Sequence, residues 1–262
     1  FNLIDIDGEN DGDVLADDSD ANGDSMTVTQ IAVTGSSNAA VASSSSYNSN
    51  ATSRTGTYGT LRIGADGTYD YVADQSAADA LDPGDIVTDS FTYTVSDGTD
   101  ESTATLIITV IGINDDPVPD NETNSVDTSQ TLTVTDGTAD VLHGDTDADA
   151  SASLSVFSIT ATTAGGSETA VNIGTAYNSG YTEVTGSYGK LRIGSDGTYQ
   201  YIADSSAGTD VFTYTSFDGS VRVTATLTIT VNSTNNAPTA SDSIVYINEN
   251  NQVSSAGDRT PS

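Results

Sequence analysis

The sequence predicts an all-β protein made of two tandem antiparallel β-sandwiches. Thr55–Asp74 (TGTYGTLRIGADGTYDYVAD) returns as Thr185–Asp204 (TGSYGKLRIGSDGTYQYIAD), and Tyr58 and Tyr188 are 188 − 58 = 130 residues apart. Self-similarity at such a long period indicates a repeated structural unit. Many short runs of Thr, Tyr, Val and Ile lie between Asp- and Gly-rich turns, and no long stretch has the apolar period of a helix. That pattern is typical of a sandwich or a barrel.

The repeated stretch predicts a β-hairpin in each copy. Asp66-Gly67 and Asp196-Gly197 separate its two strand-like runs, and Asp-Gly favours a tight hairpin because its backbone tolerates positive φ. Arg62 and Arg192 are expected to pair with nearby aspartates across the strands. The alternating tyrosines are expected to pack in the core with their hydroxyls at its rim, in preference to forming a platform for sugars.

Further strands are predicted on both sides of the hairpin. Met26–Val33 precedes it, as Leu154–Ile159 does in the second copy, and the stretch from Asn38 to Ser53 is a long loop or a weak edge strand. Asp74–Asp89 follows the hairpin as an acidic connection that contains a turn. The two strands richest in β-favouring residues end each unit; they are Ser90–Ser96 and Thr103–Ile111, then Val211–Ser216 and Thr224–Val231.

Each unit ends at a proline. Asn114-Asp115-Asp116-Pro117 closes the first unit and Asn235-Asn236-Ala237-Pro238 closes the second. Proline stops a strand because it lacks the N–H that the ladder needs. We therefore predict one sandwich over 1–116, a second over 117–237 and a C-terminal extension over 238–262.

The two units differ in the segment that leads into them. Val118–Gln130 leads into the second unit and has no counterpart in the first, whereas Thr239–Val253 carries an additional strand after the second unit. Two explanations remain open. Either the chain is a slice of a longer tandem array and this strand begins a third unit, or the strand is donated across a sheet edge to the open first unit of a neighbouring molecule.

Charge and composition exclude several classes of function. The net charge is −32, from 38 acidic against 6 basic residues, and such a field repels nucleic acid and anionic membranes. No apolar run is long enough for membrane insertion, and the absence of cysteine excludes disulfide and thiolate sites. His143 is the only histidine and no feature marks a cleft with paired carboxylates, so we do not expect an enzyme.

The acidic residues indicate a hard cation, because all but six of the 38 are aspartates. Ca²⁺ takes about six to eight oxygen ligands from carboxylates, amides and carbonyls. Neither acidic loop has the glutamate or the helices of an EF-hand, so part of each ligand set must come from elsewhere. The alternative is that these side chains cap turns and solvate a loop or linker. The candidate ligands are Asp18, Asp20, Asn22 and Asp24 in one loop, Asp145, Asp147 and Asp149 in the other, and Asn114, Asp115 and Asp116 at the junction.

Three stretches in each unit resemble the VCBS repeat of large bacterial surface proteins and RTX-type adhesins. They are Gly59–Asp74, Asp89–Gly98 and Thr103–Pro117, and again Gly189–Asp204, Asp210–Gly219 and Thr224–Pro238. The acidic loops DVLADDSDANGD and DVLHGDTDADA are similar to the opening loop of that family. The resemblance implies cadherin-like or immunoglobulin-like sandwiches. The second unit departs from the family pattern at Ser216-Phe217, and its closing junction is poorer in carboxylates.

Residues and resemblance together predict a calcium-stiffened spacer or stalk in a secreted adhesin or surface protein of a bacterium. The expected cofactor is Ca²⁺, and the expected partners are neighbouring repeats of the same or an identical chain. The location is extracellular, at the cell surface. Two other functions remain open: a subunit of a filament or surface layer that is joined by strand donation, and a module that binds a glycan or a host or bacterial surface through a loop such as Asn38–Ser53.

Overall fold

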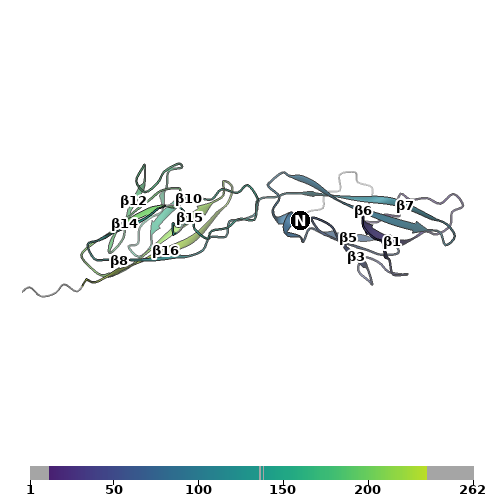
Figure 1. The fold of residues 1–262 in the computed structure, drawn as a ribbon, viewed down its shortest axis with the longest axis horizontal. Coiled ribbons are helices and arrows are strands. Elements are labelled where there is room, and N and C mark those ends of the chain that lie inside the picture. Colours follow the sequence, from purple (N-terminus) through teal and green to yellow (C-terminus); the bar gives the residue numbers. More distant parts are fainter. Residues whose placement is uncertain (1–11, 136, 138, 235–262) are drawn as a thin grey trace, which may run out of the picture.

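The protein forms two β-sandwiches that follow one another along the long axis of the molecule (Figure 1). The computed structural model describes residues 12–135, 137 and 139–234. The first unit contains β1 (Thr27–Val33), β2 (Ala39–Ala40), β3 (Thr52–Thr55), β4 (Thr60–Ile63), β5 (Tyr69–Val72), α1 (Ser76–Asp79), β6 (Ile86–Ser96) and β7 (Glu101–Ile111). The second contains β8 (Glu122–Asp127), β9 (Thr131–Val134), β10 (Ser155–Ala161), β11 (Thr169–Ala170), β12 (Thr182–Thr185), β13 (Gly189–Ile193), β14 (Tyr199–Ala203), β15 (Gly208–Phe217) and β16 (Arg222–Asn232).

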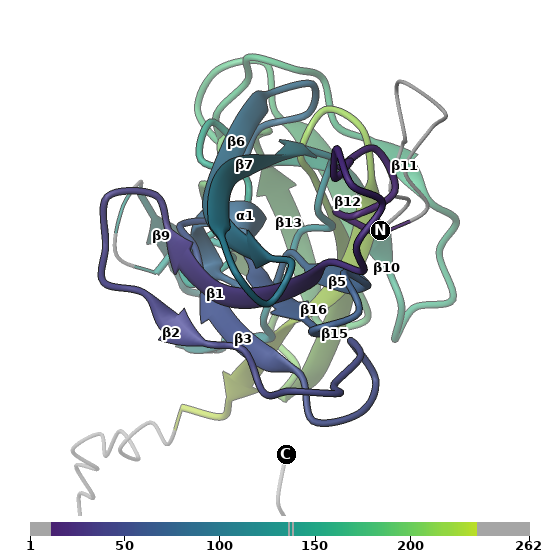
Figure 2. The same cartoon turned by 90° about the vertical axis from the view of Figure 1, so that its right-hand side faces the viewer.

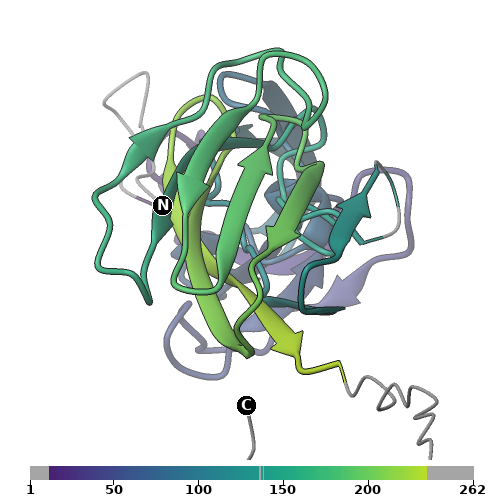
Figure 3. The same cartoon turned by 90° about the vertical axis from the view of Figure 1, so that its left-hand side faces the viewer.

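Each sandwich consists of two sheets that enclose one apolar core. The sheet β2-β1-β6-β7 faces β3-β4-β5 in the first unit, and β11-β10-β15-β16-β8 faces β12-β13-β14-β9 in the second. Views along the long axis from its two ends show the first unit (Figure 2) and the second unit (Figure 3) in front. The side chains at the centres of the cores are fully buried; they include Ile31, Leu61 and Phe91, and Ile159, Leu191 and Phe212.

The two units share their strand register. Phe91 pairs with Leu106 between β6 and β7, and Phe212 pairs with Leu227 between β15 and β16, so equivalent residues of these hairpins are 212 − 91 = 121 positions apart. The Asp-Gly hairpins also form as predicted, with φ of +87° at Gly67 and +83° at Gly197. The prediction of an all-β chain with tandem sandwiches is confirmed.

The second unit has two strands that the described part of the first unit lacks. β8 lies parallel to β16, and β9 pairs antiparallel with β14. Both strands come from the segment after Pro117, which the sequence analysis distinguishes as the lead into the second unit. In the first unit, β7 is the edge strand of its sheet, with no described strand on its outer side. Residues 1–11, at the start of this unit, and the C-terminal extension over 238–262 lie outside the described residues.

A buried aspartate joins the hairpin to the long strands in each unit, and we call this feature the aspartate clasp. Asp89 accepts hydrogen bonds of 2.6–3.1 Å from the N–H groups of Thr57, Tyr58 and Gly59 and from the Tyr71 hydroxyl. Asp210 accepts bonds of 2.6–3.0 Å from the N–H groups of Ser187 and Tyr188 and from the Tyr201 hydroxyl. A Cβ at Gly56 or Gly186 would lie 2.3 or 2.2 Å from the carboxylate, so both positions require glycine.

The clasp corrects one expectation about the tyrosines. They do pack in the core, but the hydroxyls of Tyr71 and Tyr201 point to the interior carboxylates and not to the rim. Tyrosine can be buried in this way because the carboxylate satisfies its hydroxyl. Burial, followed by the hydrogen bond to Asp210, raises the pKa of Tyr201 far above its ordinary value.

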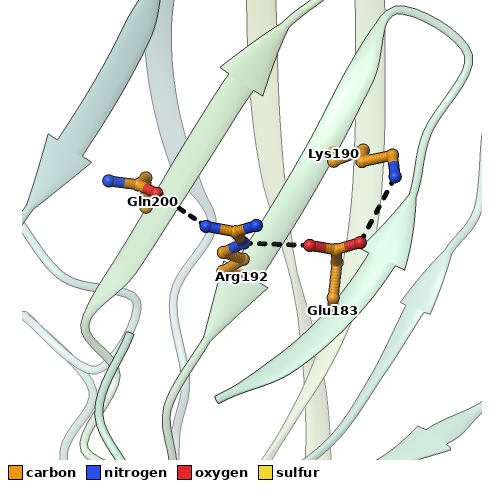
Figure 4. Close-up of polar contacts among 4 residues, drawn as sticks. All are labelled: Glu183, Lys190, Arg192 and Gln200. Carbon is orange, nitrogen blue, oxygen red and sulfur yellow. Dashed lines mark hydrogen bonds and ion pairs between the residues drawn. The ribbon is translucent and has the colours of Figure 1, made fainter. Parts of the chain in front are cut away.

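Exposed ion pairs lie on the hairpins. Arg62 pairs with Asp70 on the adjacent strand at 2.5 Å, as predicted. Arg192 pairs at 2.9 Å with Glu183, which also contacts Lys190 at 3.4 Å (Figure 4). The prediction of an aspartate partner is therefore wrong for Arg192, because Gln200 stands opposite it where Asp70 stands opposite Arg62. Exposed pairs of this kind contribute little to stability.

The structure departs from the predicted elements in the connection after the hairpin, whereas the stretch from Asn38 to Ser53 agrees with the predicted loop or weak edge strand. The acidic connection after the hairpin contains the four-residue helix α1, and β6 begins at Ile86, earlier than predicted. The stretch from Asn38 to Ser53 contains the two-residue strand β2 and the start of β3. No helix among the described residues is long and apolar enough to cross a bilayer.

Candidate functional site: the acidic junction between the units

The linker between the two sandwiches is tied to both of them by hydrogen bonds. Asn114 Nδ2 donates to Asp218 Oδ2 at 2.9 Å, and the Asp115 N–H donates to Asp149 Oδ2 at 3.1 Å. From the opposite side, the Ser151 N–H of the second unit donates to Oδ1 of Asp82 in the first, at 2.8 Å. The junction is therefore built from side chains of both units and from the linker itself.

Gly112 positions the contribution of the first unit. Its N–H donates to the Asp85 carbonyl oxygen, and its own carbonyl oxygen accepts from the Gly84 N–H. A Cβ at this position would lie 2.2 Å from the carbonyl oxygen of Asp82. Only glycine permits this close approach, which holds the turn containing Asp82 against the start of the linker.

The loop over 145–149 brings three aspartates to the junction end of the second unit. Asp145 Oδ1 accepts from the Asp120 N–H and from the Tyr214 hydroxyl, both at 3.0 Å. Asp147 Oδ1 accepts from the Asp149 N–H, also at 3.0 Å. The other oxygens are buried and have no hydrogen-bond partner in the structure; they are Asp145 Oδ2, Asp147 Oδ2 and Asp149 Oδ1. Because burying an unpaired carboxylate oxygen is costly, the oxygens of Asp147 and Asp149 are suited to a cation, whereas the Asp145 carboxylate also interacts with the Ser216 side chain.

Burial and neighbouring charges shift the pKa values of two carboxylates at the junction. Burial, followed by the charges of Asp149, Asp79 and Asp147, raises the pKa of Asp115 above its ordinary value. Burial also raises the pKa of Asp145, although hydrogen bonds to it oppose the shift. Both carboxylates therefore resist ionisation in the folded protein, and a positive charge nearby would relieve that cost.

The pKa of Asp218 is shifted in the opposite direction to those of Asp115 and Asp145. Burial opposes its ionisation, but hydrogen bonds from Asn114 Nδ2 and from the N–H groups of Val221 and Ser220 hold the pKa of Asp218 below its ordinary value. Its charge is satisfied by the protein itself. Asp218 therefore serves to hold the linker through Asn114, and it is a weaker candidate ligand than Asp115 or Asp149.

The donor set fits a hard divalent cation such as Ca²⁺, which prefers carboxylate, amide and carbonyl oxygens. The linker supplies Asn114, Asp115 and Asp116, and the second unit supplies Asp147 and Asp149. The charges of Asp116, Asp147 and Asp149 all act on Asp115, whereas Asp145 lies with Asp120 and Tyr214. In the described part of the chain, no group of three or more His, Cys, Asp or Glu side chains is placed so that it could hold a metal ion.

The first acidic loop is arranged differently. Asp20 Oδ1 accepts from the N–H groups of Asn22 and Asp24 at 2.8 and 2.9 Å, so this carboxylate caps its own loop. Asn22 and Asp24 are exposed, and Asp18 Oδ2 lies 3.3 Å from the Tyr93 hydroxyl. The structure does not gather these four side chains around one point. Asp18 and Asp20 instead line a surface depression together with Asp97, Asp100 and Glu101.

The chain matches a known family over both units. The description "Bacterial cadherin-like domain" fits residues 4–112 and again residues 114–233. The chain belongs to the bacterial cadherin-like domain family. No curated protein matches this bacterial cadherin-like pair.

Solved structures similar to the bacterial cadherin-like pair share few identical residues with it. The endo-fucoidan hydrolase MfFcnA4 from glycoside hydrolase family 107 is 20% identical, with 70% of this chain and 23% of that chain covered and a TM-score of 0.26. Mouse clustered PcdhgC3 EC1-3 is 15% identical, with coverages of 65% and 50% and a TM-score of 0.30. The zebrafish RET cadherin-like domains 1 to 4 are 10% identical, with coverages of 80% and 41% and a TM-score of 0.24. The chain thus spans half or less of these structures' length.

Both bacterial cadherin-like domains contribute junction residues that the sequence does not mark as ligands or tethers. Asp82 lies in the acidic connection that follows the first hairpin, and Asp218 lies in the turn between β15 and β16, yet both also bond across the junction. The clue in the sequence is topological, because the turn between the last two strands of the second domain lies at the end where the linker enters. Asp120 is harder to foresee, since its backbone N–H is the group that contacts Asp145.

Proposed function

We propose that this pair of bacterial cadherin-like domains is a calcium-stiffened spacer or stalk segment of a secreted cell-surface protein, of the VCBS-repeat and RTX-adhesin type. The role is structural and not enzymatic. The tandem match to a family whose domains are usually extracellular supports it. The observation that carries the proposal is the pair of buried, unpartnered oxygens of Asp147 and Asp149, whose charges both act on Asp115 at the junction.

In this proposal the ligands of the cation come from the linker and from the second domain. Asp115 would be joined by Asp147 and Asp149, with Asn114 and Asp116 beside them. Calcium would supply positive charge and ordered coordination to carboxylates that otherwise repel one another. Because the linker continues directly from β7 of the first domain, a cation held here fixes the direction in which the second domain leaves the first.

The expected gain in stability follows from the affinity. Extracellular calcium modules bind with dissociation constants of about 10⁻⁴–10⁻³ M. At free calcium of about 10 to 100 times the dissociation constant, one site adds roughly 1.4–2.7 kcal/mol to the free energy of unfolding. That contribution is large for a domain whose total stability is of the order of 5–15 kcal/mol.

Melting and scattering of the intact chain test the proposal together. With calcium in excess over chelator, we expect a higher Tm and a narrow distribution of small-angle scattering distances, because the two domains keep one orientation. With chelator, the Tm falls and the distribution broadens. Magnesium at the same concentration serves as the control for ionic strength, and we expect a smaller effect because it loses its water reluctantly. Equal Tm values and equal scattering with calcium and with chelator would sink the proposal.

A further inference from the structure

The strand that begins the second domain and the strand that ends it are neighbours in one sheet. β8 lies parallel to β16, with Glu122 opposite Leu227 and Asp127 opposite Asn232. Parallel neighbours run in the same direction, so the start of β8 and the end of β16 lie at opposite ends of the pair. The chain therefore enters the second domain at one end of this pair and continues from the other end.

Tension along the chain would act on this pair along its length. The linker reaches the second domain from the side of the first domain, whereas β16 ends at the far side (Figure 1). A pull on both would draw the start of β8 toward the first domain and the end of β16 away from it. Because the hydrogen bonds of a ladder run across the strands, such sliding strains all the bonds of the pair together. Separation from one end would instead break them one after another.

Direct contacts continue the pair beyond both ends of β8. At its start, Asn121 Oδ1 accepts from the N–H and the hydroxyl of Thr226, at 2.9 and 2.8 Å. At its end, the Thr128 N–H donates to the carbonyl oxygen of Asn232 at 2.9 Å, and the hydroxyl oxygens of Thr128 and Thr234 are 3.1 Å apart. These contacts add to the number of bonds that sliding must break.

Two side chains of β8 also contact the interior of the sandwich. Val126 packs against the core, and Asn124 Nδ2 donates to the hydroxyl of Tyr199 in the facing sheet, at 3.1 Å. The Tyr199 side chain is fully buried. Sliding β8 along β16 would withdraw both Val126 and Asn124, so the loss of apolar burial and of this hydrogen bond adds to the cost of breaking the ladder.

The contacts that the linker makes before β8 are short. Val118 and Thr146 exchange two backbone hydrogen bonds, of 2.7 and 3.1 Å. Nearer to the first domain, the Asp115 N–H donates to Asp149 Oδ2. Tension that enters from the first domain acts on these contacts first. Among the described residues, the β8–β16 pair is then the first continuous ladder that the tension meets.

We propose that the β8–β16 pair is a mechanical clamp, which gives the second domain the function of resisting tension along the chain. Forced unfolding is governed by the rate of unfolding and not by the equilibrium stability. The resistance of this domain therefore depends on the direction of the pull. The clamp lies within the second domain, so it acts with or without a cation at the junction and does not rest on the calcium proposal.

Two directions of pull on the intact chain test the clamp by single-molecule force measurement. The chain has no natural cysteine, so introduced cysteines are the only points of attachment. Val118→Cys with Ser233→Cys applies the force along β8 and β16. Ser129→Cys with Ser233→Cys is the matched control, because it applies the force at the end that the two strands share. All three side chains are exposed, and both pairs of attachment points lie outside the first domain.

At one pulling speed, we expect the unfolding force to be at least about twofold higher along the strands than at their shared end, since many bonds must then break together. Thermal melts of the two double variants should agree, because the folded domain is the same in both. Equal unfolding forces in the two directions, or a higher force at the shared end, overturn the proposal.

A single substitution tests the contribution of β8 itself. With the force along the strands, Asn121→Ala removes the two bonds to Thr226 and should lower the unfolding force. Thr162→Ala is the matched control, because it removes an exposed side-chain bond to Thr213 that lies outside the pair, and it should leave the force unchanged. Equal losses of force in these two variants contradict the clamp.

Measurements in chelator and in calcium separate the clamp from the calcium proposal. We expect the difference between the two directions of pull to persist in chelator. A difference that exists only with calcium overturns the clamp and assigns the resistance to the junction. A difference that is the same in both, with equal Tm values in both, supports the clamp and counts against calcium.

Discussion

The two acidic loops of this chain have the same spacing of oxygen-bearing residues but different surroundings. Asp145, Asp147 and Asp149 lie at the junction, and each keeps one buried oxygen without a partner. Asp18, Asp20 and Asn22 are their equivalents at the outer end of the first domain, 127 positions earlier. There Asn22 is exposed, and Asp20 Oδ1 accepts hydrogen bonds from two N–H groups of its own loop.

The linker accounts for the surroundings of the second loop. Asp115 arrives from the first domain, donates its N–H to Asp149 and covers the second loop, so the carboxylates become both buried and crowded. No described segment lies in that place at the outer end of the first domain. The spacing of the aspartates therefore supplies candidate ligands. The contact with the neighbouring domain buries their carboxylates, and burial makes the binding of a cation favourable.

The largest loss of stability is expected from changing the aspartate clasp, which both domains contain. Asp89→Asn and Asp210→Asn each remove the charge of one aspartate clasp and leave buried N–H groups badly paired. Hydrogen bonds to a charged group contribute about 1.5–3 kcal/mol each, so we expect the affected domain to lose about 3 kcal/mol. For a domain of about 100 residues that loss lowers the Tm by roughly 12–24 °C.

Calorimetry of both variants checks this expectation, with Asp100→Asn in the exposed turn as the control. Its Tm should stay within about 2 °C of the unaltered chain, since exposed substitutions change stability by about 0.5 kcal/mol or less. Equal losses in the two domains indicate that both are equally well built. A much smaller loss for Asp89→Asn would mean that the first domain is less well packed than the second. The exposure of its acidic loop would then follow from that poorer packing, and the explanation based on the linker would fail.

An intermediate effect on Tm and calcium affinity is expected from substitutions at the equivalent positions Asp149 and Asn22. Asp149→Asn removes one of the charges that act on Asp115, so it raises the Tm in chelator and lowers the gain on adding calcium. We expect calcium affinity at the junction to fall at least about tenfold, equivalent to about 1.4 kcal/mol. Asn22→Ala leaves the Tm in chelator and the calcium affinity nearly unchanged, because Asn22 is exposed and its side chain is remote from the linker.

Calcium titration by calorimetry measures both variants, and Asp24→Asn is a charge-matched control in the outer loop. A loss of affinity as large for Asp24→Asn as for Asp149→Asn would place the dominant calcium site at the outer end. In that case the first acidic loop, and not the loop at the junction, would be the stronger calcium site.

The fold could be predicted because its causes are local. Asp66-Gly67 and Asp196-Gly197 require a turn whatever surrounds them, and the alternation in Thr103–Ile111 specifies a strand with one inward face. The four-residue helix α1 was beyond reach, because it is too short to show a helical period. The buried aspartates of the clasp were also hidden, since Asp89 and Asp210 look like turn formers among 32 aspartates until the hairpin folds over them.

The candidate site could be predicted in its parts but not in its arrangement. The ligand chemistry of Asp115, Asp147 and Asp149 is visible in the sequence, and so is the proline that ends the unit. Which oxygens lose water depends on contacts between residues far apart in the chain, such as Asn114 with Asp218, 104 positions later. For the same reason the loops at 18–24 and 145–149 look equivalent in the sequence, although among the described residues only the second lies under a linker.

The smallest expected effect is a dependence of stability on pH that comes from described carboxylates with raised pKa values: Asp115 and Asp145 at the junction and Glu122 at the start of β8. Asp115 and Asp145 have raised pKa values, so the folded state binds protons more readily than the unfolded state. In chelator, stability should therefore increase by a few degrees of Tm as the pH falls from 7 toward the ordinary aspartate pKa of about 4. Groups with lowered pKa values, such as Asp97 and Asp218, lose their contribution only below that window.

Saturating calcium should reverse this slope, because protons then compete with the cation for the same carboxylates. Asp115→Asn should reduce the slope of the profile in chelator, with Asp145 and Glu122 supplying the rest, whereas Asp24→Asn in the outer loop should leave it unchanged. Thermal melts between pH 4.5 and 7.5 in chelator and in calcium measure all four curves. A slope in chelator that Asp115→Asn leaves intact would assign the excess protons to other groups. The linker would then crowd the carboxylates of the second loop less than the pKa values of Asp115 and Asp145 indicate.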